Sequence, residues 1–267
     1  MSQVYFTSSK LKSYLPDWLV VIGLSLFFFY FTETLQPFQR QFYINDPKIG
    51  HPFAQVERVT DDQLYVYSTL IPMFIISISS LYLGQTNFDK LHLMQVSNLG
   101  LLLSVSSVSV LTDFLKVWIG TPRPDFIERC GPRVGTPLDT MVTASEVCTA
   151  PLGAMYLADG MKSTPSGHSS MAFAGLCYLS LWLIGQFKII SNKDNEKYRM
   201  PCVIIAFLPV LGASYIGLSR TQDYRHHFFD VCFGSLLGIM FAFGSYYKYF
   251  RRLTVDESNK PIDYNQV

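Results

Sequence analysis

The 267-residue chain contains few charged residues. Asp, Glu, Lys and Arg together make up 15% of the sequence, whereas soluble domains carry about 25%. This shortage indicates that lipid rather than water surrounds much of the chain. The net charge of +1 shows no basic excess, so we expect no nucleic-acid partner. No alanine-x-alanine cleavage site follows a basic start, so we expect no cleaved signal peptide.

Cysteine is also scarce, and the five cysteines form neither a CxxC pair nor a zinc-binding spacing. Cys177, Cys202 and Cys232 lie in apolar runs and are expected in the core. Cys130 and Cys148 share one polar loop, and they form a disulfide only if that loop faces an oxidising compartment. The sequence leaves that pairing open. It also lacks Asn-x-Ser/Thr, so no N-linked glycan is expected.

Long apolar runs, in contrast, are plentiful. Six windows contain no Asp, Glu, Lys or Arg, namely 18–32, 63–88, 91–112, 163–187, 200–219 and 231–247. A membrane-spanning helix needs about 20 apolar residues, within a range of about 17–25. The windows lack the alternation of a barrel strand, so helices are the spanning element that fits them. We therefore predict an all-α membrane bundle of six helices at 18–32, 63–88, 91–112, 166–187, 200–219 and 228–247.

An even number of spans places both termini on one side of the membrane. The last window is followed directly by three basic residues, Lys248, Arg251 and Arg252. They favour cytosolic termini, because basic residues collect on the cytosolic side. The loop 113–162 then forms a lumenal subdomain between helices three and four, in which we expect short helices because structureless loops are rarely so long. Residues 1–255 are predicted to form one membrane-embedded domain, and 256–267 a flexible polar tail.

Polar residues suited to chemistry gather on that lumenal side, just outside the last four helices. They form three groups: Lys116 with Arg123 and Pro124; then Pro165-Ser166-Gly167-His168; then Ser219 and Arg220 with His226, His227 and Asp230. Arginine offers a planar fork that matches phosphate oxygens, and lysine a point charge. The Ser166-Gly167 backbone precedes a helix, so its N–H groups are able to face an anion. Interfacial snorkelling explains any one of the three cations, but not three beside two histidines.

The histidines of the third group suggest a nucleophile. His226 and Asp230 are four residues apart, which on a helix places them on one face, about 5–6 Å apart at Cβ. A carboxylate there holds one ring N–H and leaves the other nitrogen free to attack phosphorus. His168, which titrates near neutral pH, then serves as general acid. Two alternatives stay open: the His226–Asp230 pair as a structural cap, and His227 as a weaker rival nucleophile.

The three groups together resemble the signature of the type-2 phosphatidic acid phosphatases, also called lipid phosphate phosphatases. That pattern reads Lys, six residues, Arg-Pro; then Pro-Ser-Gly-His; then Ser-Arg, five residues, His, three residues, Asp. The chain matches it, with correct internal spacing, at Lys116, Arg123, Pro124, Pro165, Ser166, Gly167, His168, Ser219, Arg220, His226 and Asp230. The resemblance extends over 60–248 through the helix layout.

The resemblance implies six transmembrane helices and an active site at the lumenal or extracellular face. It implies that His226 is the nucleophile, that Asp230 orients it, and that His168 is the general acid and base. The phosphate would be surrounded by Lys116, Arg123, Ser166, Gly167 and Arg220. No cofactor and no metal are implied, and the motifs show no two-metal arrangement of carboxylates. The nearest carboxylates, those of Asp113 and Asp125, are expected to orient Lys116 and Arg123.

Within the family, the loop 37–59, the block 219–227 and the pair Cys130 and Cys148 look like those of the fungal diacylglycerol pyrophosphate phosphatases. This narrower resemblance implies that membrane glycerolipids are the partners. The β-phosphate of diacylglycerol pyrophosphate would leave first, and phosphatidate would be dephosphorylated next. A vacuolar or Golgi membrane is also implied. Both a fold-stabilising role and a substrate-gating role fit the loop 37–59.

We expect a two-step displacement through a phosphohistidine on His226, with the cations stabilising the equatorial oxygens. The closest rival is an isoprenoid or sphingoid phosphate phosphatase on the same residues. A catalytically inactive relative is disfavoured, because both histidines and Asp230 are retained. A six-span transporter would need charged or helix-breaking residues near mid-membrane, whereas the charges here lie at the ends of the predicted spans.

Overall fold

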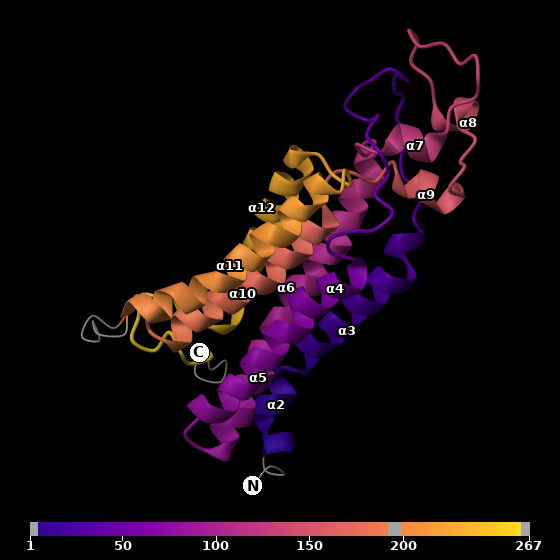
Figure 1. Ribbon diagram of the computed structural model, residues 1–267. Coiled ribbons are helices and arrows are strands. Elements are labelled where there is room, and N and C mark those ends of the chain that lie inside the picture. Colours follow the sequence, from indigo (N-terminus) through magenta and orange to yellow (C-terminus); the bar gives the residue numbers. More distant parts are fainter. Residues whose placement is uncertain (1–4, 192–198, 263–267) are drawn as a thin grey trace.

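The computed structural model describes residues 5–191 and 199–262. This part of the chain contains isolated β-bridges but no strand, and its helices form one elongated bundle (Figure 1). In chain order the helices are α2 (Ser9–Ser13), α3 (Leu15–Tyr30), α4 (Asp61–Tyr65), α5 (Ile71–Leu83), α6 (Asn87–Ile119), α7 (Phe126–Cys130), α8 (Ala144–Val147), α9 (Ala154–Asp159), α10 (Gly167–Gln186), α11 (Arg199–Gln222) and α12 (Phe228–Tyr249). A 3₁₀ turn at Thr32–Thr34 follows α3, and a π-helical turn at Val66–Leu70 joins α4 to α5.

Among the residues that the structure describes, five helices are long and apolar enough to cross a membrane: Asp61–Leu83, Asn87–Ile119, Gly167–Gln186, Met200–Gln222 and Phe228–Tyr249. Each coincides with a predicted span, so the all-α class and these five apolar helices are confirmed. The first predicted span, 18–32, corresponds to α3. That helix has 16 residues and a length of about 24 Å, which is short for a bilayer core of about 30 Å.

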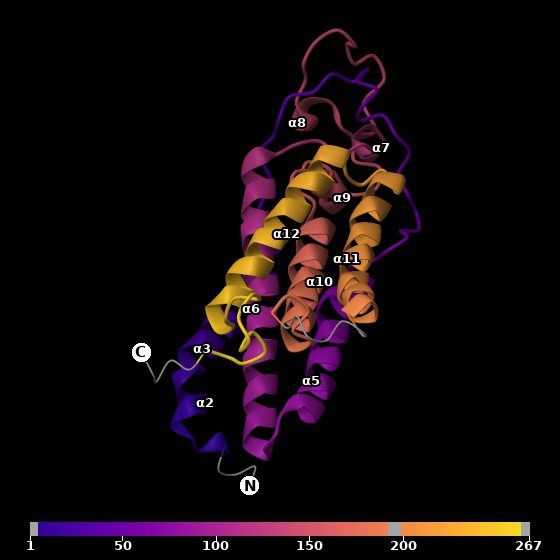
Figure 2. The ribbon, with the colours of Figure 1, turned by 90° about the vertical axis from the view of Figure 1, so that its left-hand side faces the viewer.

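Helix α10 is the centre of the bundle. Of its apolar window 83% is buried, against 28–39% for the windows of the other four. It packs against α6, α11 and α12 (Figure 2). These three helices cover most of the surface of α10, and α10 therefore fixes how they sit relative to one another.

Two glycines let α12 approach α10 closely. A Cβ on Gly234 would lie 2.4 Å from the Ser166 carbonyl oxygen, and one on Gly238 would lie 2.4 Å from that of Ser170. Their spacing is that of the small-residue motif that brings membrane helices into backbone contact. This contact seats the start of α12 beside the start of α10, where two of the three motif groups lie.

Helix α6 is longer than the predicted span 91–112. It runs for 33 residues to Ile119 and ends at Gly120, whose φ of 59° is the left-handed conformation of a helix C-terminus. The charged residues Asp113 and Lys116 therefore lie on the last turns of the helix instead of in a loop. They project beyond the apolar part of α6 and reach the site.

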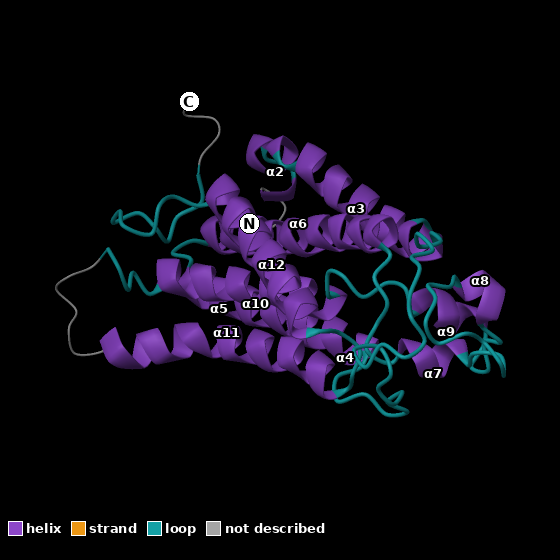
Figure 3. Cartoon of the chain, turned by 90° about the horizontal axis from the view of Figure 1, so that it is seen from above, coloured by secondary structure: helices purple, strands orange, loops and turns teal. Residues whose placement is uncertain are grey.

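Two segments, 37–59 and 120–162, pack on each other at one end of the bundle, and we call them the cap (Figure 3). Phe42 and Val142 exchange backbone hydrogen bonds of 3.0 Å. A disulfide joins Cys130 to Cys148, so the pairing that the sequence left open is present. The cap has a small core of its own, formed by Phe42, Ile49, Phe126, Cys130, Val142, Ala144, Val147 and Met161. The short helices expected in this loop are α7, α8 and α9.

The chain beyond α12 turns back onto the opposite end of the bundle. Phe250 pairs with Pro261 in an isolated bridge, and the buried Ser258 donates its hydroxyl to the Gly185 carbonyl at 3.3 Å. The first part of the predicted tail, residues 256–262, thus contacts α10. Residues 263–267 lie outside the described part of the chain.

Candidate active site

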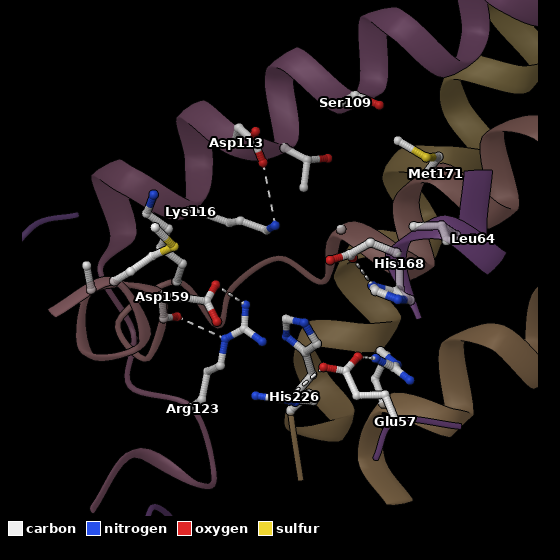
Figure 4. Close-up of a pocket in the computed structure, with 18 of the residues that line it drawn as sticks. Glu57, Leu64, Ser109, Asp113, Lys116, Arg123, Asp159, His168, Met171 and His226 are labelled. Atoms are coloured by element: carbon white, nitrogen blue, oxygen red, sulfur yellow. Dashed lines mark hydrogen bonds and ion pairs between the residues drawn. The ribbon is translucent and has the colours of Figure 1, made fainter. Parts of the chain in front are cut away.

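A cavity of about 1190 Å³ lies where the cap meets the ends of α6, α10 and α11 (Figure 4). It brings together six of the eight residues expected at the site: Lys116, Arg123, Gly167, His168, Arg220 and His226. The other two, Ser166 and Asp230, are 0% and 2% exposed and lie behind the residues that line the cavity. Motif groups separated by up to a hundred residues therefore converge on one space.

Lys116 reaches the start of α10 from the last turn of α6. Its Nζ lies 3.5 Å from Asp113 Oδ1, so the expectation that Asp113 orients Lys116 is confirmed. A Cβ on Gly167 would lie 2.8 Å from the same Nζ. A larger side chain there would displace the ammonium at the flexible end of Lys116 from the N-terminus of α10. The positive helix end and Lys116 together favour an anion between them.

Arg123 is held by a residue of the cap that sequence reasoning missed. Its Nε donates to the Asp159 carbonyl at 3.0 Å, and its Nη2 donates to Asp159 Oδ1 at 2.7 Å. Arg129 Nη1 donates to the other carboxylate oxygen at 2.8 Å. Burial raises the pKa of Asp159, but Arg123 and then Arg129 outweigh it and bring that pKa to about 2. A permanently charged Asp159 thus keeps the Arg123 guanidinium facing His226 (Figure 4).

Asp125 was expected to orient Arg123, and that expectation is wrong. Its carboxylate accepts from Arg129 at 2.9 and 3.0 Å and lies 3.4 Å from Arg225 Nη1. Asp125 and Arg129 are both fully buried. They lie four residues apart, with Asp125 just before α7 and Arg129 in its last turn. Asp125 therefore supports Arg123 indirectly: Asp125 pairs with Arg129, Arg129 pairs with Asp159, and Asp159 pairs with Arg123.

Ser166 builds the wall of the cavity instead of facing it. Its side chain accepts from the Ser169 backbone N–H at 3.4 Å as the N-cap of α10, and it also accepts from the Ser169 hydroxyl at 3.1 Å. Its own backbone N–H donates to the Asp230 carbonyl at 3.0 Å. These bonds fix where α10 begins and how α12 lies against it.

His168 occupies the first turn of α10 with one ring nitrogen already committed. Its Nε2 lies 3.1 Å from the Val59 carbonyl oxygen, which can only accept, so Nε2 carries a hydrogen. The other nitrogen, Nδ1, lies 3.8 Å from Asp61 Oδ1, and Asp61 also lines the cavity. Nδ1 is therefore the nitrogen that is able to exchange a proton with a group in the cavity.

His226 is fixed by a backbone carbonyl. Its Nδ1 donates to the Ser163 carbonyl oxygen at 2.7 Å, which leaves Nε2 with a lone pair. Burial lowers the pKa of His226 well below its usual range, and Arg123 and Lys116 lower it further. The ring is consequently neutral and able to act as a nucleophile near neutral pH.

Asp230 does not sit on one helical face with His226, as the four-residue spacing had suggested. Helix α12 begins at Phe228, so His226 precedes the helix and His227 is its N-cap. Among the described residues, the Asp230 carboxylate bonds to Ser163 Oγ at 2.6 Å, to Thr164 Oγ1 at 2.5 Å and to the His227 backbone N–H at 2.9 Å, but not to His226. Asp230 thus fixes Ser163, whose backbone carbonyl accepts the hydrogen bond from His226 Nδ1.

His227, the rival nucleophile, has both ring nitrogens occupied. Nδ1 lies 3.2 Å from Asp230 Oδ2, and Nε2 lies 3.2 Å from the Lys48 carbonyl oxygen. The hydrogen bond with Asp230 raises the pKa of His227. Its ring points toward the cap loop and is not among the residues that line the cavity. The geometry therefore favours His226.

Arg220 closes the site from α11. Nη1 donates to Glu57 Oε2 at 2.6 Å, Nη2 to Asp223 Oδ2 at 2.8 Å, and Nε to Ser219 Oγ at 3.2 Å. Glu57 belongs to the cap segment 37–59, and its second oxygen lies 2.6 Å from Arg225. Alternating charges thus connect the two arginines of the motif groups in the order Arg123, Asp159, Arg129, Asp125, Arg225, Glu57 and Arg220.

The cavity also has an apolar side, formed by Phe28 and Phe29 of α3 and by Leu64 and Tyr65 of α4. The cavity thus combines cationic side chains with an apolar lining.

Within the described ranges, no three His, Cys, Asp or Glu side chains gather as a metal-binding group.

Comparisons with known proteins agree with this arrangement. The family described as the PAP2 superfamily matches residues 98–254. "Diacylglycerol pyrophosphate phosphatase 1" of Saccharomyces cerevisiae is 50% identical over 232 residues, which are 85% of this chain and 76% of that protein. "Probable diacylglycerol pyrophosphate phosphatase 1" of Schizosaccharomyces pombe is 38% identical over 94% of this chain and 86% of its own length. "Lipid phosphate phosphatase 1" of Arabidopsis thaliana is 38% identical over 93% of this chain and 72% of its own.

Proposed function

This chain belongs to the PAP2 superfamily, and we propose that it is a multi-pass membrane phosphatase that hydrolyses diacylglycerol pyrophosphate to phosphatidate, and phosphatidate to diacylglycerol. The matched residues 98–254 include all three motif groups. The names of the relatives support the lipid substrates. The observation that carries the proposal is that the His226 ring shares one cavity with three cations, Lys116, Arg123 and Arg220.

In the first step, His226 Nε2 attacks phosphorus and the bond from phosphorus to the leaving oxygen breaks. Lys116, Arg123 and the α10 N-terminus face the charge that develops on the equatorial oxygens, where fixed cations lower the barrier most. His168 Nδ1 gives its proton to the departing phosphatidate or diacylglycerol oxygen. The Ser163 carbonyl, fixed by Asp230, stabilises the phosphorylated imidazole through its Nδ1–H.

In the second step, a water molecule attacks phosphorus and the phosphorus–nitrogen bond breaks. His168, now neutral, takes the proton of the attacking water and returns to its protonated form. His226 recovers its neutral ring, and inorganic phosphate is left among the cations. Both proton transfers use the same nitrogen of His168, because the Val59 carbonyl occupies the other.

We propose that the lipid enters sideways between α3 and α4. The aromatic and aliphatic side chains of these helices line the same cavity as the cations, so acyl chains would stay in the bilayer while the phosphate reaches His226. We propose that α3 completes a sixth span. Its side chains Leu19, Leu26 and Phe29 are 69%, 53% and 53% exposed, as expected of a helix that faces lipid, and Trp18 and Tyr30 would anchor its ends.

We further propose that the cap faces the lumen of an endomembrane such as the vacuole or Golgi, with both termini in the cytosol. The disulfide between Cys130 and Cys148 supports this orientation, because disulfides persist in oxidising compartments. The basic residues after α12 support it from the other side of the membrane.

The decisive assay measures phosphate release by the purified full-length chain in detergent micelles. Diacylglycerol pyrophosphate and phosphatidate are compared with isoprenoid pyrophosphate and sphingosine phosphate, each with and without excess EDTA. We expect the two glycerolipids to be hydrolysed best and EDTA to have no effect. A strict requirement for Mg²⁺, or a clear preference for an isoprenoid or sphingoid substrate, would contradict the proposal.

The nucleophile is tested with two adjacent histidines as a matched pair. His226→Ala is expected to reduce turnover to background and to abolish labelling from a substrate with a radioactive terminal phosphate. His227→Ala, which changes the same residue type one position on, is expected to keep both turnover and labelling. Robust turnover by the His226 variant would refute the phosphohistidine.

A further inference from the structure

Arg220 has only one partner that a substrate is able to replace. The guanidinium is 1% exposed, and each of its three nitrogens bonds to another side chain. Asp223 is itself fixed, because its fully buried carboxylate accepts from the Arg58 backbone N–H at 2.9 Å and from the Arg58 side chain at 2.5 Å. Glu57, in contrast, has a side chain that is 26% exposed and lines the cavity (Figure 4).

Glu57 also has a second cation within reach. Its Oε1 lies 2.6 Å from Arg225 Nη2, while its Oε2 lies 2.6 Å from Arg220 Nη1. Arg225 is held in turn by Asp125 and lies with its guanidinium 4.3 Å above the Phe53 ring. A rotation of the Glu57 side chain would therefore release Arg220 and leave the carboxylate paired with Arg225 alone.

The backbone around Glu57 is not free to move with it. The next residue, Arg58, is bonded to Asp223 through its backbone N–H, and the Val59 carbonyl holds His168. An outward movement of the whole segment would break both contacts and misplace the general acid. If another group is to replace Glu57 at Arg220, the Glu57 side chain must therefore move while its backbone stays in place.

A carboxylate and a phosphate oxygen on the same Nη1 repel each other, and a site with little water screens that repulsion poorly. We propose that Glu57 is an internal competitor for phosphate at Arg220. It pairs with Arg220 in the empty site, turns onto Arg225 when a phosphate binds, and returns to help expel inorganic phosphate after hydrolysis. The inference rests on the proposed function, since it assigns Arg220 to the phosphate.

The test measures binding of inorganic phosphate and orthovanadate to the full-length protein in detergent, from the concentration dependence of its melting temperature. Glu57→Gln and Glu57→Ala are expected to bind both anions about tenfold more tightly or better, the scale of one charge-assisted hydrogen bond. Inorganic phosphate should inhibit their turnover correspondingly more. Asp62→Asn is the matched control, because Asp62 is an exposed carboxylate outside the cavity, and its affinities should equal those of the wild type.

A second variant is expected to change the affinity in the opposite direction. Arg225→Gln removes the alternative partner, so Glu57 should stay on Arg220 and phosphate should bind more weakly than to the wild type. Unchanged or weaker anion binding in the Glu57 variants would show that Glu57 only buttresses Arg220, and would overturn the proposal. The melting readout needs no turnover. If the wild-type protein released no phosphate from lipids, that result would contradict the proposed function and not the role of Glu57.

Discussion

His226 and His227 are adjacent in the chain but lie in opposite electrostatic surroundings. Burial, reinforced by Arg123 and Lys116, lowers the pKa of His226. The Asp230 carboxylate raises the pKa of His227. A neutral imidazole is a nucleophile and an imidazolium is not. In the proposed mechanism the same residue type therefore serves two purposes one position apart: attack on phosphorus and the start of helix α12.

The pH dependence of chemical modification tests this contrast. Diethyl pyrocarbonate reacts with neutral imidazole, so the modified fraction rises as pH rises through the pKa. We expect the midpoint for His226 to lie below the usual histidine value of about 6.5 and that for His227 above it. Mass spectrometry of peptides from one sample reads both sites, and each histidine is the control for the other. The same midpoint for both, or the reverse order, would contradict the assignment.

The spacing of the motifs predicted most of the residues that meet in the cavity, because a phosphate needs several cations and one nucleophile within a few ångströms. It did not predict the partners of those residues. Asp159 is the last residue of the short helix α9 and Glu57 lies in a loop, so neither belongs to a periodic pattern, and only tertiary packing brings them to Arg123 and Arg220. The expected Asp230–His226 contact failed for a local reason: α12 starts at Phe228, so helical spacing does not extend to residue 226.

At the scale of elements, the cap is a part of the candidate active site and not merely a cover. It carries Arg123 and Asp159 in one segment and Glu57 in the other. Its attachment to the bundle is partly polar: Arg58 pairs with Asp223, and the Arg40 guanidinium donates to the Ile119 carbonyl at 2.7 Å. The disulfide and the small core around Phe126 keep the segment 120–162 compact enough to hold these side chains in place.

Reduction of the disulfide should therefore weaken the site. Cys130 and Cys148 are 18 residues apart, and cross-links over loops of this length stabilise by about 3 kcal/mol. We expect a reducing agent to lower the thermal inactivation midpoint of the wild type and of Cys232→Ser, whose thiol is free. The double variant Cys130→Ser and Cys148→Ser should begin at the lower midpoint and not respond. An unchanged wild-type midpoint after complete reduction would contradict this role.

The helices of the bundle were predictable because charge-free runs of suitable length have few other uses in a chain so poor in charge. The ends of these helices were less predictable. Helix α6 continues to Ile119 because Asp113 and Lys116 pair along its surface and Gly120 supplies the left-handed stop, a signal that a hydropathy window cannot register. The cap helices are each only four to six residues long, too short to show a periodicity.

The molecule as a whole is polarised along its long axis. The cap, the disulfide and the catalytic cavity lie at one end of the bundle, and α2 and the segment after α12 lie toward the other (Figure 1). The exposed large apolar side chains of α3, α5 and α11 lie on the helices between these ends. This arrangement suits a protein whose chemistry takes place at one surface of a bilayer.

Glycosylation mapping tests whether the cap lies at the lumenal or the cytosolic surface of the membrane. The sequence lacks Asn-x-Ser/Thr, so any glycan must come from an introduced site. Leu138→Asn creates an acceptor ending at Thr140, on a cap residue that is 54% exposed and far from the bundle. Because the transferase acts in the lumen, we expect this variant to gain mass that an endoglycosidase removes. An acceptor sequence added after Val267 should stay unmodified, as a cytosolic terminus requires. A glycan at the C-terminus and none on the cap would reverse the proposed orientation and place the phosphatase reaction in the cytosol.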